Sequence, residues 1–258
     1  MTSLFDLSGH HALVTGGAQG LGRMIAEELL RAGASVTVTS RKPEALEKAA
    51  ADMSEIGACI PIEANLASAQ DAISFSQRYM SQVGRCSILV NNAGKSWGAP
   101  LEEFPDKAWP DILSINVQVP FTLSRELLPL LREAATEDTP SRILNIGSIA
   151  GAKVQGLQAY SYSASKAAIH MLSRDLAAEF ATEHLTVNTL IPGYFPTKMT
   201  AHLRDGEAID PQTLERIPMR RFGKADEIGG AAVFLCSRAA SYITGTALAV
   251  DGGILNCS

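Results

Sequence analysis

Residues 11–22 read H-A-L-V-T-G-G-A-Q-G-L-G, and this stretch decides the fold. The short apolar run predicts a strand that breaks at Gly16, and the apolar side chains that follow at helical spacing predict a helix that stops at Gly33. Gly16 permits a tight turn, while Gly20 and Gly22 let the backbone and the helix N-terminus approach a pyrophosphate. The spacing G-x-x-x-G-x-G differs from the G-x-G-x-x-G fingerprint, so a plain glycine-rich connection is the alternative interpretation.

The same strand and helix pattern repeats along the chain. Six further strands are predicted at residues 35–39, 58–62, 87–90, 143–146, 185–191 and 247–250. Alternating strands and helices predict a doubly wound Rossmann-type α/β fold, with a seven-stranded parallel sheet and helices on both faces. The 258 residues, 46% of them hydrophobic, suit one domain spanning 1–258. Residues 194–219, interrupted by proline and glycine, are expected to form a substrate lid.

The end of the second predicted strand indicates the cofactor. A carboxylate there would hold the ribose diol of NAD, but the chain reads Thr39-Ser40-Arg41-Lys42. Arg41, with Ser40, is expected to receive the 2′-phosphate of NADP, and one charged hydrogen bond corresponds to roughly a 10- to 100-fold preference. Gln19 supplies no second cation in the glycine turn. A solvated loop arginine is the alternative interpretation.

Two later strand ends extend this predicted cofactor site. Asn65 and Leu66 follow the third strand, where they could flank an adenine. Ala93 and Gly94 follow the fourth strand and are small enough for a ribose to lie against the backbone. The two asparagines that precede them can pin neighbouring loops.

The candidate catalytic groups lie between residues 142 and 166. Tyr162 and Lys166 are four residues apart on a predicted helix, so the ammonium can lie near the phenol. A nearby positive charge lowers the pKa of a phenol, which makes Tyr162 a candidate acid or base at neutral pH. Ser148, at the end of the fifth strand, could bind the same substrate oxygen. This arrangement describes carbonyl reduction or alcohol oxidation, although a helix surface pair would also explain Tyr-x-x-x-Lys.

The helical stretch 107–131 contains a further candidate, Asn116. Asparagine is unfavourable inside a helix, so Asn116 is expected either to face solvent or to satisfy a local kink. Pro120, four residues later, cannot donate a backbone hydrogen bond to the carbonyl of Asn116, which favours the kink.

The composition argues against several other functions. The net charge of −5, with no long basic run, predicts no nucleic-acid surface. The first residues lack the basic and apolar parts of a signal segment, and no apolar run is long enough to span a membrane, so a cytoplasmic protein is expected. The 4 cysteines are scattered and are expected to be reduced, and no histidine or cysteine spacing predicts a metal site.

Taken together, the motifs resemble the short-chain dehydrogenase/reductase family, in its compact single-domain branch. The likeness covers essentially the whole chain and rests on T-G-G-A-Q-G-L-G (15–22), N-N-A-G (91–94), I-G-S (146–148), Y-S-A-S-K (162–166), I-P-G (191–193) and V-D-G-G (250–253). The resemblance implies that Tyr162 is the general acid and that Lys166 lowers its pKa and holds the nicotinamide ribose. It implies that Ser148 orients the carbonyl and that Asn116 supports a proton-relay water.

The resemblance also implies contacts with NADP. They would come from the glycine turn, the strand ends and the start of the lid: Gly16, Gln19, Gly20, Leu21, Gly22, Ser40, Arg41, Asn65, Leu66, Asn92, Ala93, Gly94, Tyr162, Lys166, Pro192, Gly193, Phe195 and Thr197. Asn65 stands where the family more often has aspartate, which is a mild departure.

Within the family, the chain is most similar to the bacterial 3-oxoacyl-[acyl-carrier-protein] reductases, including the rhamnolipid-associated type. N-N-A-G-K-S-W-G-A (91–99), L-L-P-L-L-R (127–132) and I-P-M-R-R-F-G-K (217–224) carry this likeness. It implies NADPH-dependent reduction of a 3-oxoacyl thioester in fatty acid metabolism, and a homotetramer formed through the long helices and the last strand.

One surface feature argues against a carrier-protein substrate. Ala178 stands where carrier-protein reductases tend to have a basic residue, and Glu179 and Glu183 make the surface acidic. An acyl carrier protein is itself acidic and would be repelled. A thioester of coenzyme A or a free small ketone therefore stays open as the substrate.

Two alternatives to the 3-oxoacyl hypothesis follow from the same residues. The chain could be a dehydrogenase or reductase of another alcohol, polyol or ketone, or a non-catalytic NADP-binding sensor. Trp97, Leu157, Tyr160 and Phe195 suggest an apolar substrate pocket, although core or lid packing would explain each of them. A polyol site should present more hydrogen-bonding side chains.

Overall fold

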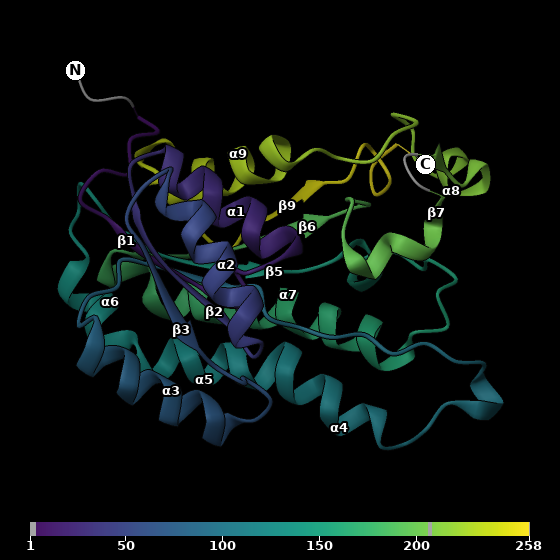
Figure 1. The fold of residues 1–258 in the computed structure, drawn as a ribbon, viewed down its shortest axis with the longest axis horizontal. Helices are drawn as coiled ribbons and strands as arrows, with labels where there is room; N and C mark the ends of the chain where they lie inside the picture. Colours follow the sequence, from purple (N-terminus) through teal and green to yellow (C-terminus); the bar gives the residue numbers. More distant parts are fainter. Residues whose placement is uncertain (1–3, 206–207, 258) are drawn as a thin grey trace.

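The computed structural model describes residues 4–205 and 208–257 of the chain. Its main sheet is fully parallel, with the strand order β3-β2-β1-β4-β5-β6-β9 (Figure 1). The strands are β1 (His11–Val14), β2 (Ser35–Ser40), β3 (Cys59–Glu63), β4 (Ile88–Asn91), β5 (Ser141–Ile146), β6 (Leu185–Pro192) and β9 (Ala247–Val250). The seven predicted strands are confirmed, each end lying within two residues of its prediction.

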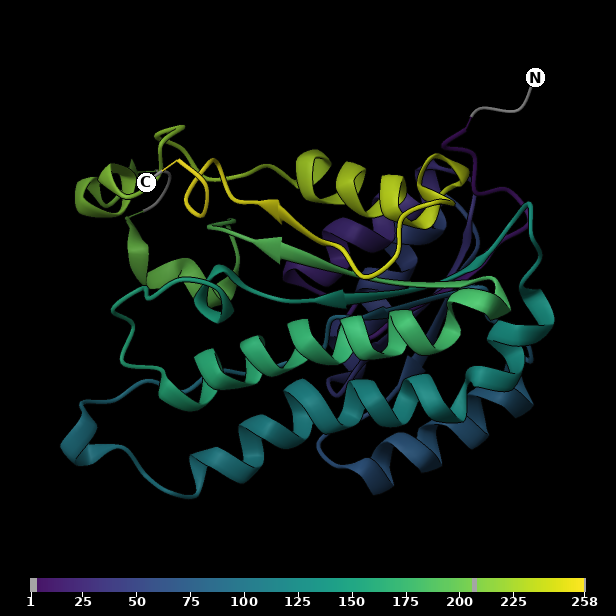
Figure 2. The same ribbon diagram turned by 180° about the vertical axis from the view of Figure 1, so that it is seen from behind.

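Helices cover both faces of the sheet, as Figures 1 and 2 show. One face carries α1 (Gly20–Arg31), α2 (Pro43–Ser54) and α9 (Ala225–Cys236). The other carries α3 (Ala69–Gln82), α4 (Ala108–Leu113), α5 (Val119–Glu126), α6 (Leu128–Ala134) and α7 (Tyr160–Phe180). Because both faces are covered, the central strands read as continuous apolar runs, which is why the sequence pattern locates them well. The predicted Rossmann-type fold is confirmed.

The helical stretch predicted at 107–131 is not one regular helix. A π-helical turn, Ser114–Gln118, separates α4 from α5, and α6 begins after a further break. Pro120 stands in the first turn of α5, where a missing amide proton is tolerated. Asn116 is buried inside the π-helical turn, so the predicted local kink is correct and solvent exposure is wrong.

The site forms at the carboxyl ends of the strands. β1 pairs with both β2 and β4, so the chain winds outward in both directions from this point and leaves a crevice beside it. The predicted lid lies at the same edge (Figure 1). It comprises a 3-10 helix (Lys198–Leu203), the short hairpin of β7 (Arg204–Asp205) and β8 (Ala208–Ile209), and α8 (Pro211–Glu215). Residues 206 and 207 of the predicted lid lie outside the described residues.

A buried histidine links the first two strands. The Nδ1 atom of His11 lies 2.8 Å from Ser35 Oγ, and its Nε2 atom lies 2.9 Å from Thr37 Oγ1. Burial lowers the pKa of His11 from 6.5 to about 4. Because the folded-state pKa lies below the unfolded value, the stability linked to His11 is complete above pH 6.5 and is lost as the pH falls toward 4.

We therefore expect acid to destabilise the fold through His11. Between pH 7.5 and pH 5, this residue should lower the free energy of unfolding by about 2 kcal/mol. Urea denaturation at both pH values measures the loss, and in His11→Gln, which keeps polar atoms but cannot ionise, the pH dependence should be smaller by that amount. An equal pH dependence in the wild type and the variant would contradict the assignment.

Candidate active site

Three of the four residues predicted to be catalytic, Ser148, Tyr162 and Lys166, lie together at one end of the crevice. Tyr162 and Lys166 stand on the first turns of α7, and Ser148 follows β5 and forms a hydrogen bond with the Tyr162 phenol. A Cβ atom at Gly151 would lie 2.5 Å from the carbonyl carbon of Lys166, so glycine is needed for the segment after Ser148 to pack against α7. The Lys166 ammonium donates a hydrogen bond to the carbonyl of Ile146 at 2.7 Å, and lies 5.7 Å from the centre of the Tyr162 ring.

The pKa of Tyr162 differs from the prediction. Burial raises the pKa of Tyr162 above 10, and the hydrogen bond from Ser148 opposes the shift without overcoming it. Burial also lowers the pKa of Lys166 to about 8. The expected lowering of the Tyr162 pKa is therefore wrong for this structure, because desolvation of the phenol outweighs the hydrogen bond from Ser148. A phenol that is neutral at pH 7 is the form that can give a proton to a carbonyl oxygen.

Asn116 connects two of the elements that form the site. Its Oδ1 atom accepts a hydrogen bond from Lys95 N at 3.0 Å, and its Nδ2 atom donates to Lys95 O at 3.0 Å and to Ser165 Oγ at 2.9 Å. Ser165 in turn donates to the carbonyl of Tyr162 at 2.7 Å. The side chain thus ties the segment after β4 to the catalytic end of α7. The predicted relay water is a separate role and stays a prediction.

A cleft of about 670 Å³ runs along the carboxyl ends of the strands, from Arg41 to Tyr162. Most of the predicted cofactor residues line it: Gly16, Gln19, Gly20, Leu21, Ser40, Arg41, Asn65, Leu66, Asn92, Ala93, Gly94, Tyr162, Lys166 and Thr197. Gly16 and Gly20 adopt positive φ angles of 64° and 57°, so the glycine turn presents its backbone in a conformation that other residues rarely adopt. The volume of the cleft and the hydrogen-bond donors that line it fit a dinucleotide.

Four predicted cofactor residues do not line the cleft. Gly22 packs beneath the turn: a Cβ atom there would lie 2.6 Å from Gly16 O and would displace the Asn92 amide, which donates to Thr15 O at 2.8 Å. Phe195 is buried in the core. The other two, Pro192 and Gly193, lie at the end of β6, where the second of them donates a backbone hydrogen bond to β9. These residues support the walls of the cleft.

The structure also adds lining residues that the motifs did not indicate: Ala18, Thr39, Ala64, Ala67, Lys95, Ser96, Asp111, Ile115, Ile146, Gly147, Lys198 and Met199. Lys95 forms an ion pair with Asp111 at 2.9 Å on the cleft wall. Ile115 lies inside the π-helical turn, so the spacing of a regular helix did not place it at the cleft.

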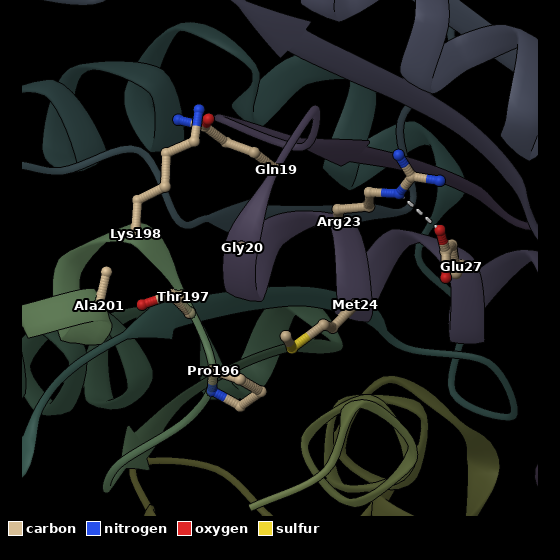
Figure 3. A pocket seen from close by; sticks show the side chains of 9 residues that line it. All are labelled: Gln19, Gly20, Arg23, Met24, Glu27, Pro196, Thr197, Lys198 and Ala201. Carbon is tan, nitrogen blue, oxygen red and sulfur yellow. Dashed lines mark hydrogen bonds and ion pairs between the residues drawn. The ribbon is translucent and has the colours of Figure 1, made fainter. Parts of the chain in front are cut away.

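Lys198, one of the added lining residues, lies on the predicted lid. It also lines a neighbouring pocket of about 460 Å³, together with Gln19 and Gly20 of the glycine turn (Figure 3). Arg23, in the same pocket, is paired with Glu27 and Asp52 at 2.7 and 3.0 Å, whereas Lys198 makes no ion pair within the described chain. The lid thus brings a cation to the glycine turn, where the sequence supplied only Gln19.

Two further observations concern metals and membranes. Within residues 4–205 and 208–257, histidine, cysteine and acidic side chains form no cluster of three or more that could bind a metal ion. In the same part of the chain, no helix combines the length and the apolar character needed to cross a membrane.

A glycine turn at the switch point of a parallel sheet, with a Ser/Tyr/Lys group at the far end of the cleft, is the arrangement expected of a dinucleotide-dependent oxidoreductase. Comparison with known proteins gives the family. A family model described as "Enoyl-(Acyl carrier protein) reductase" matches residues 16–255. The chain is 45% identical to the rhamnolipids biosynthesis 3-oxoacyl-[acyl-carrier-protein] reductase of Pseudomonas aeruginosa, over 98% of this chain and 99% of that protein.

Two other relatives agree with this placement. Gluconate 5-dehydrogenase of Gluconobacter oxydans is 37% identical, over 97% of this chain and 96% of that protein. The Pseudomonas aeruginosa RhlG/NADP active-site complex superposes with a TM-score of 0.93 at 44% identity, covering 99% of this chain and all of that one. The chain belongs to the short-chain dehydrogenase/reductase family, which confirms the resemblance read from its motifs.

Proposed function

We propose that the protein reduces the keto group of a 3-oxoacyl thioester with NADPH. The observation that carries this proposal is the hydrogen-bonded pair of Ser148 and Tyr162 beside the buried Lys166, at the opposite end of the cleft from Arg41. The Pseudomonas relatives, a 3-oxoacyl reductase by name and an NADP complex, support both the substrate class and the cofactor.

The chain's own residues can perform the proton chemistry. When bound, NADPH supplies the hydride to the carbonyl carbon. Ser148 donates a hydrogen bond to the carbonyl oxygen and fixes its position, and the neutral Tyr162 phenol gives this oxygen its proton. Lys166, whose ammonium lies 5.7 Å from the centre of the phenol ring, would hold the nicotinamide ribose. Asn116 would support the water that returns a proton to the site.

The remaining residues would hold the cofactor. The backbone of the glycine turn and Lys198, which line the cleft together, would hold the pyrophosphate, and Arg41 and Ser40 would hold the 2′-phosphate. Arg41 forms no ion pair within the described chain, so its guanidinium is available for a phosphate. Asn65 and Leu66 would flank the adenine.

An apolar wall beside Tyr162 supports an acyl substrate. Ala99 N donates to the carbonyl of Gln158 at 3.1 Å and so holds the loop after β4 against the loop before α7. Trp97, next to the cleft-lining Ser96, and Leu157 are 49% and 42% exposed and offer apolar surface on these loops. Such surface suits an acyl chain better than a polyol, which needs hydrogen-bonding partners.

The outer surface favours a small thioester carrier. Glu183 accepts two hydrogen bonds from Arg132, at 2.5 and 2.8 Å, so this cation is neutralised by its own chain. Glu179 is exposed nearby, and Ala178 adds no charge. An acidic carrier protein therefore meets two glutamates here, with Arg174 as the exposed cation one turn before Ala178, whereas coenzyme A needs no cation at this surface.

NADPH oxidation across a small substrate panel tests the proposal. We expect turnover of acetoacetyl-coenzyme A and longer 3-oxoacyl thioesters, with NADPH preferred over NADH, and slower turnover of the same acyl group on acyl carrier protein. 5-Ketogluconate is the matched polyol-type substrate, chosen because of the likeness to gluconate 5-dehydrogenase. Activity on this substrate alone would replace the thioester proposal with the polyol one, and NADPH binding without any turnover would favour the sensor.

We also propose that the protein is a cytoplasmic homotetramer. The 4 cysteines are free thiols, as a reducing compartment favours. Apolar side chains are exposed on the outer face formed by α4, α5 and α7, which lie side by side in Figure 2: Trp109, Leu113, Phe121 and Met171. Tyr242 is fully exposed just before the edge strand β9. The two surfaces belong to different elements and suit two interfaces.

Light scattering coupled to size-exclusion chromatography tests the tetramer. We expect the wild type to elute as a tetramer and Phe121→Asp, which places a charge on the helical face, to elute as a dimer. Lys48→Asp, on the exposed side of α2, is the matched surface control and should not change the assembly. A monomeric wild type would contradict the proposal.

A further inference from the structure

His170 lies directly behind the catalytic group. Tyr162, Lys166 and His170 follow one another at four-residue spacing along one face of α7. The His170 side chain is buried, and its Nε2 atom accepts a hydrogen bond from the backbone N–H of Ser148 at 3.3 Å. A Cβ atom at Gly147 would lie 2.8 Å from His170 Cδ2 and closer still to Nε2, so this contact requires glycine at position 147.

The hydrogen bond between Ser148 and His170 lies just beyond the last sheet hydrogen bond of β5. Gly147 N makes the last ladder hydrogen bond after β5, to Leu190 O at 2.7 Å. The next amide, that of Ser148, is extended, with φ −168°, and its only partner within the described chain is His170. The Ser148 hydroxyl then accepts from Ala150 N at 3.1 Å and meets the Tyr162 phenol. The orientation of Ser148 thus depends on the imidazole.

We propose that His170 is a positioning residue, whose neutral imidazole accepts the Ser148 amide proton and thereby holds the Ser148 hydroxyl at Tyr162. The inference deepens the proposed function, because it rests on Ser148 and Tyr162 sharing the carbonyl oxygen. His170 reaches the reaction only through Ser148.

The surroundings keep this imidazole neutral. Burial lowers the pKa of His170 to about 4, and the positive charges of Lys166 and Arg174, one turn away on either side, act in the same direction. The facing elements contribute no charge: β6 presents Thr189, and the segment after β5 presents Gly147 and Ser148. Nε2 therefore stays an acceptor at physiological pH, and the proton of the neutral ring is on Nδ1.

Kinetics of two matched variants test the role. His170→Met fills similar space without a nitrogen or oxygen acceptor, and should lower kcat about tenfold, which corresponds to about 1.4 kcal/mol of barrier. The KM for NADPH and its Kd, from fluorescence titration, should not change. His170→Gln places an amide oxygen near the position of Nε2 and should recover most of the loss. Equal losses in both variants, or a rise in the Kd for NADPH, would show a general packing role.

A double-mutant cycle isolates the path through Ser148. In the Ser148→Ala background, where the hydroxyl is absent, His170→Met should cause almost no further loss of kcat. Losses that multiply would mean that His170 acts independently of the Ser148 hydroxyl, and would overturn the inference.

An imidazole nitrogen NMR measurement on the wild-type protein is independent of activity. We expect the His170 ring to be protonated on Nδ1, with Nε2 bare, from pH 7.5 down to pH 5. A proton on Nε2 would overturn the inference even if the kinetics agreed. A wild-type protein without carbonyl reductase activity would instead contradict the proposed function. The tautomer measured by NMR would still test whether His170 Nε2 accepts the hydrogen bond from the Ser148 amide.

Discussion

Replacing Tyr162 with phenylalanine should lower kcat for carbonyl reduction by at least about 100-fold, because the variant has no proton to give to the substrate oxygen. The variant also lacks the hydrogen bond between the phenol and Ser148, but it keeps the ring beside Lys166. The Kd for NADPH should therefore stay close to that of the wild type. Steady-state kinetics with acetoacetyl-coenzyme A, together with fluorescence titration of NADPH, measure the two quantities separately.

Tyr160 provides the matched control for this substitution. It stands two residues earlier on α7, packs edge to face on Phe104 with the ring centres 5.2 Å apart, and is 37% exposed. Tyr160→Phe keeps the ring and removes the hydroxyl, so kcat should change little. If Tyr162→Phe turned over like the wild type while NADPH was bound, another group would have to protonate the substrate, and the assigned mechanism would be wrong.

The fold was predictable because its central strands, β1, β4, β5 and β6, are buried on both faces. A parallel strand between two layers of helices reads as a continuous apolar run, and β1, β5, β6 and β9 are each followed by glycine within two residues. The residues 11–22 alone predicted a strand, a tight turn and a helix, and the structure places β1, the positive-φ glycines and α1 there. The predicted strand ends then converge, because all seven strands run in one direction.

The unpredicted parts of the site depend on contacts between distant segments. Gly22 matched a motif, but its neighbour is the Asn92 amide rather than the cleft, which only the packing of β4 against the turn reveals. Lys198 lies 179 positions after Gln19, and no local pattern relates the lid to the glycine turn. The raised pKa of Tyr162 reflects desolvation, which is a property of the assembled site and not of the Tyr-x-x-x-Lys spacing.

His170 shows where a local pattern did contain more information. The spacing that relates Tyr162 to Lys166 places His170 on the same helical face one turn later, so a third polar residue at the site could have been inferred from the sequence. The hydrogen-bond partner of His170 could not have been inferred from the sequence. The amide of Ser148 lies on another element, and its approach depends on the glycine at position 147.

Arg41→Ala should lower kcat/KM with NADPH by roughly 10- to 100-fold and leave kcat/KM with NADH unchanged. The reason is the position of the guanidinium: Arg41 lines the end of the cleft and is exposed, and it forms no ion pair within the described chain. Ser40 beside it accepts a hydrogen bond from Lys42 N at 3.1 Å, which fixes the turn after β2. The difference between the two cofactors is the 2′-phosphate, so only the NADPH reaction should respond.

Lys42→Ala is the matched control for Arg41→Ala. Lys42 is the next residue, carries the same charge and is equally exposed, but it does not line the cleft. If long-range attraction by a basic turn were sufficient, the two variants would lose NADPH affinity alike, and raising the salt concentration would remove both effects. A loss confined to Arg41→Ala that persists in high salt would instead indicate a direct hydrogen-bonded contact with the phosphate, because a paired charge at short range is screened less than a distant one.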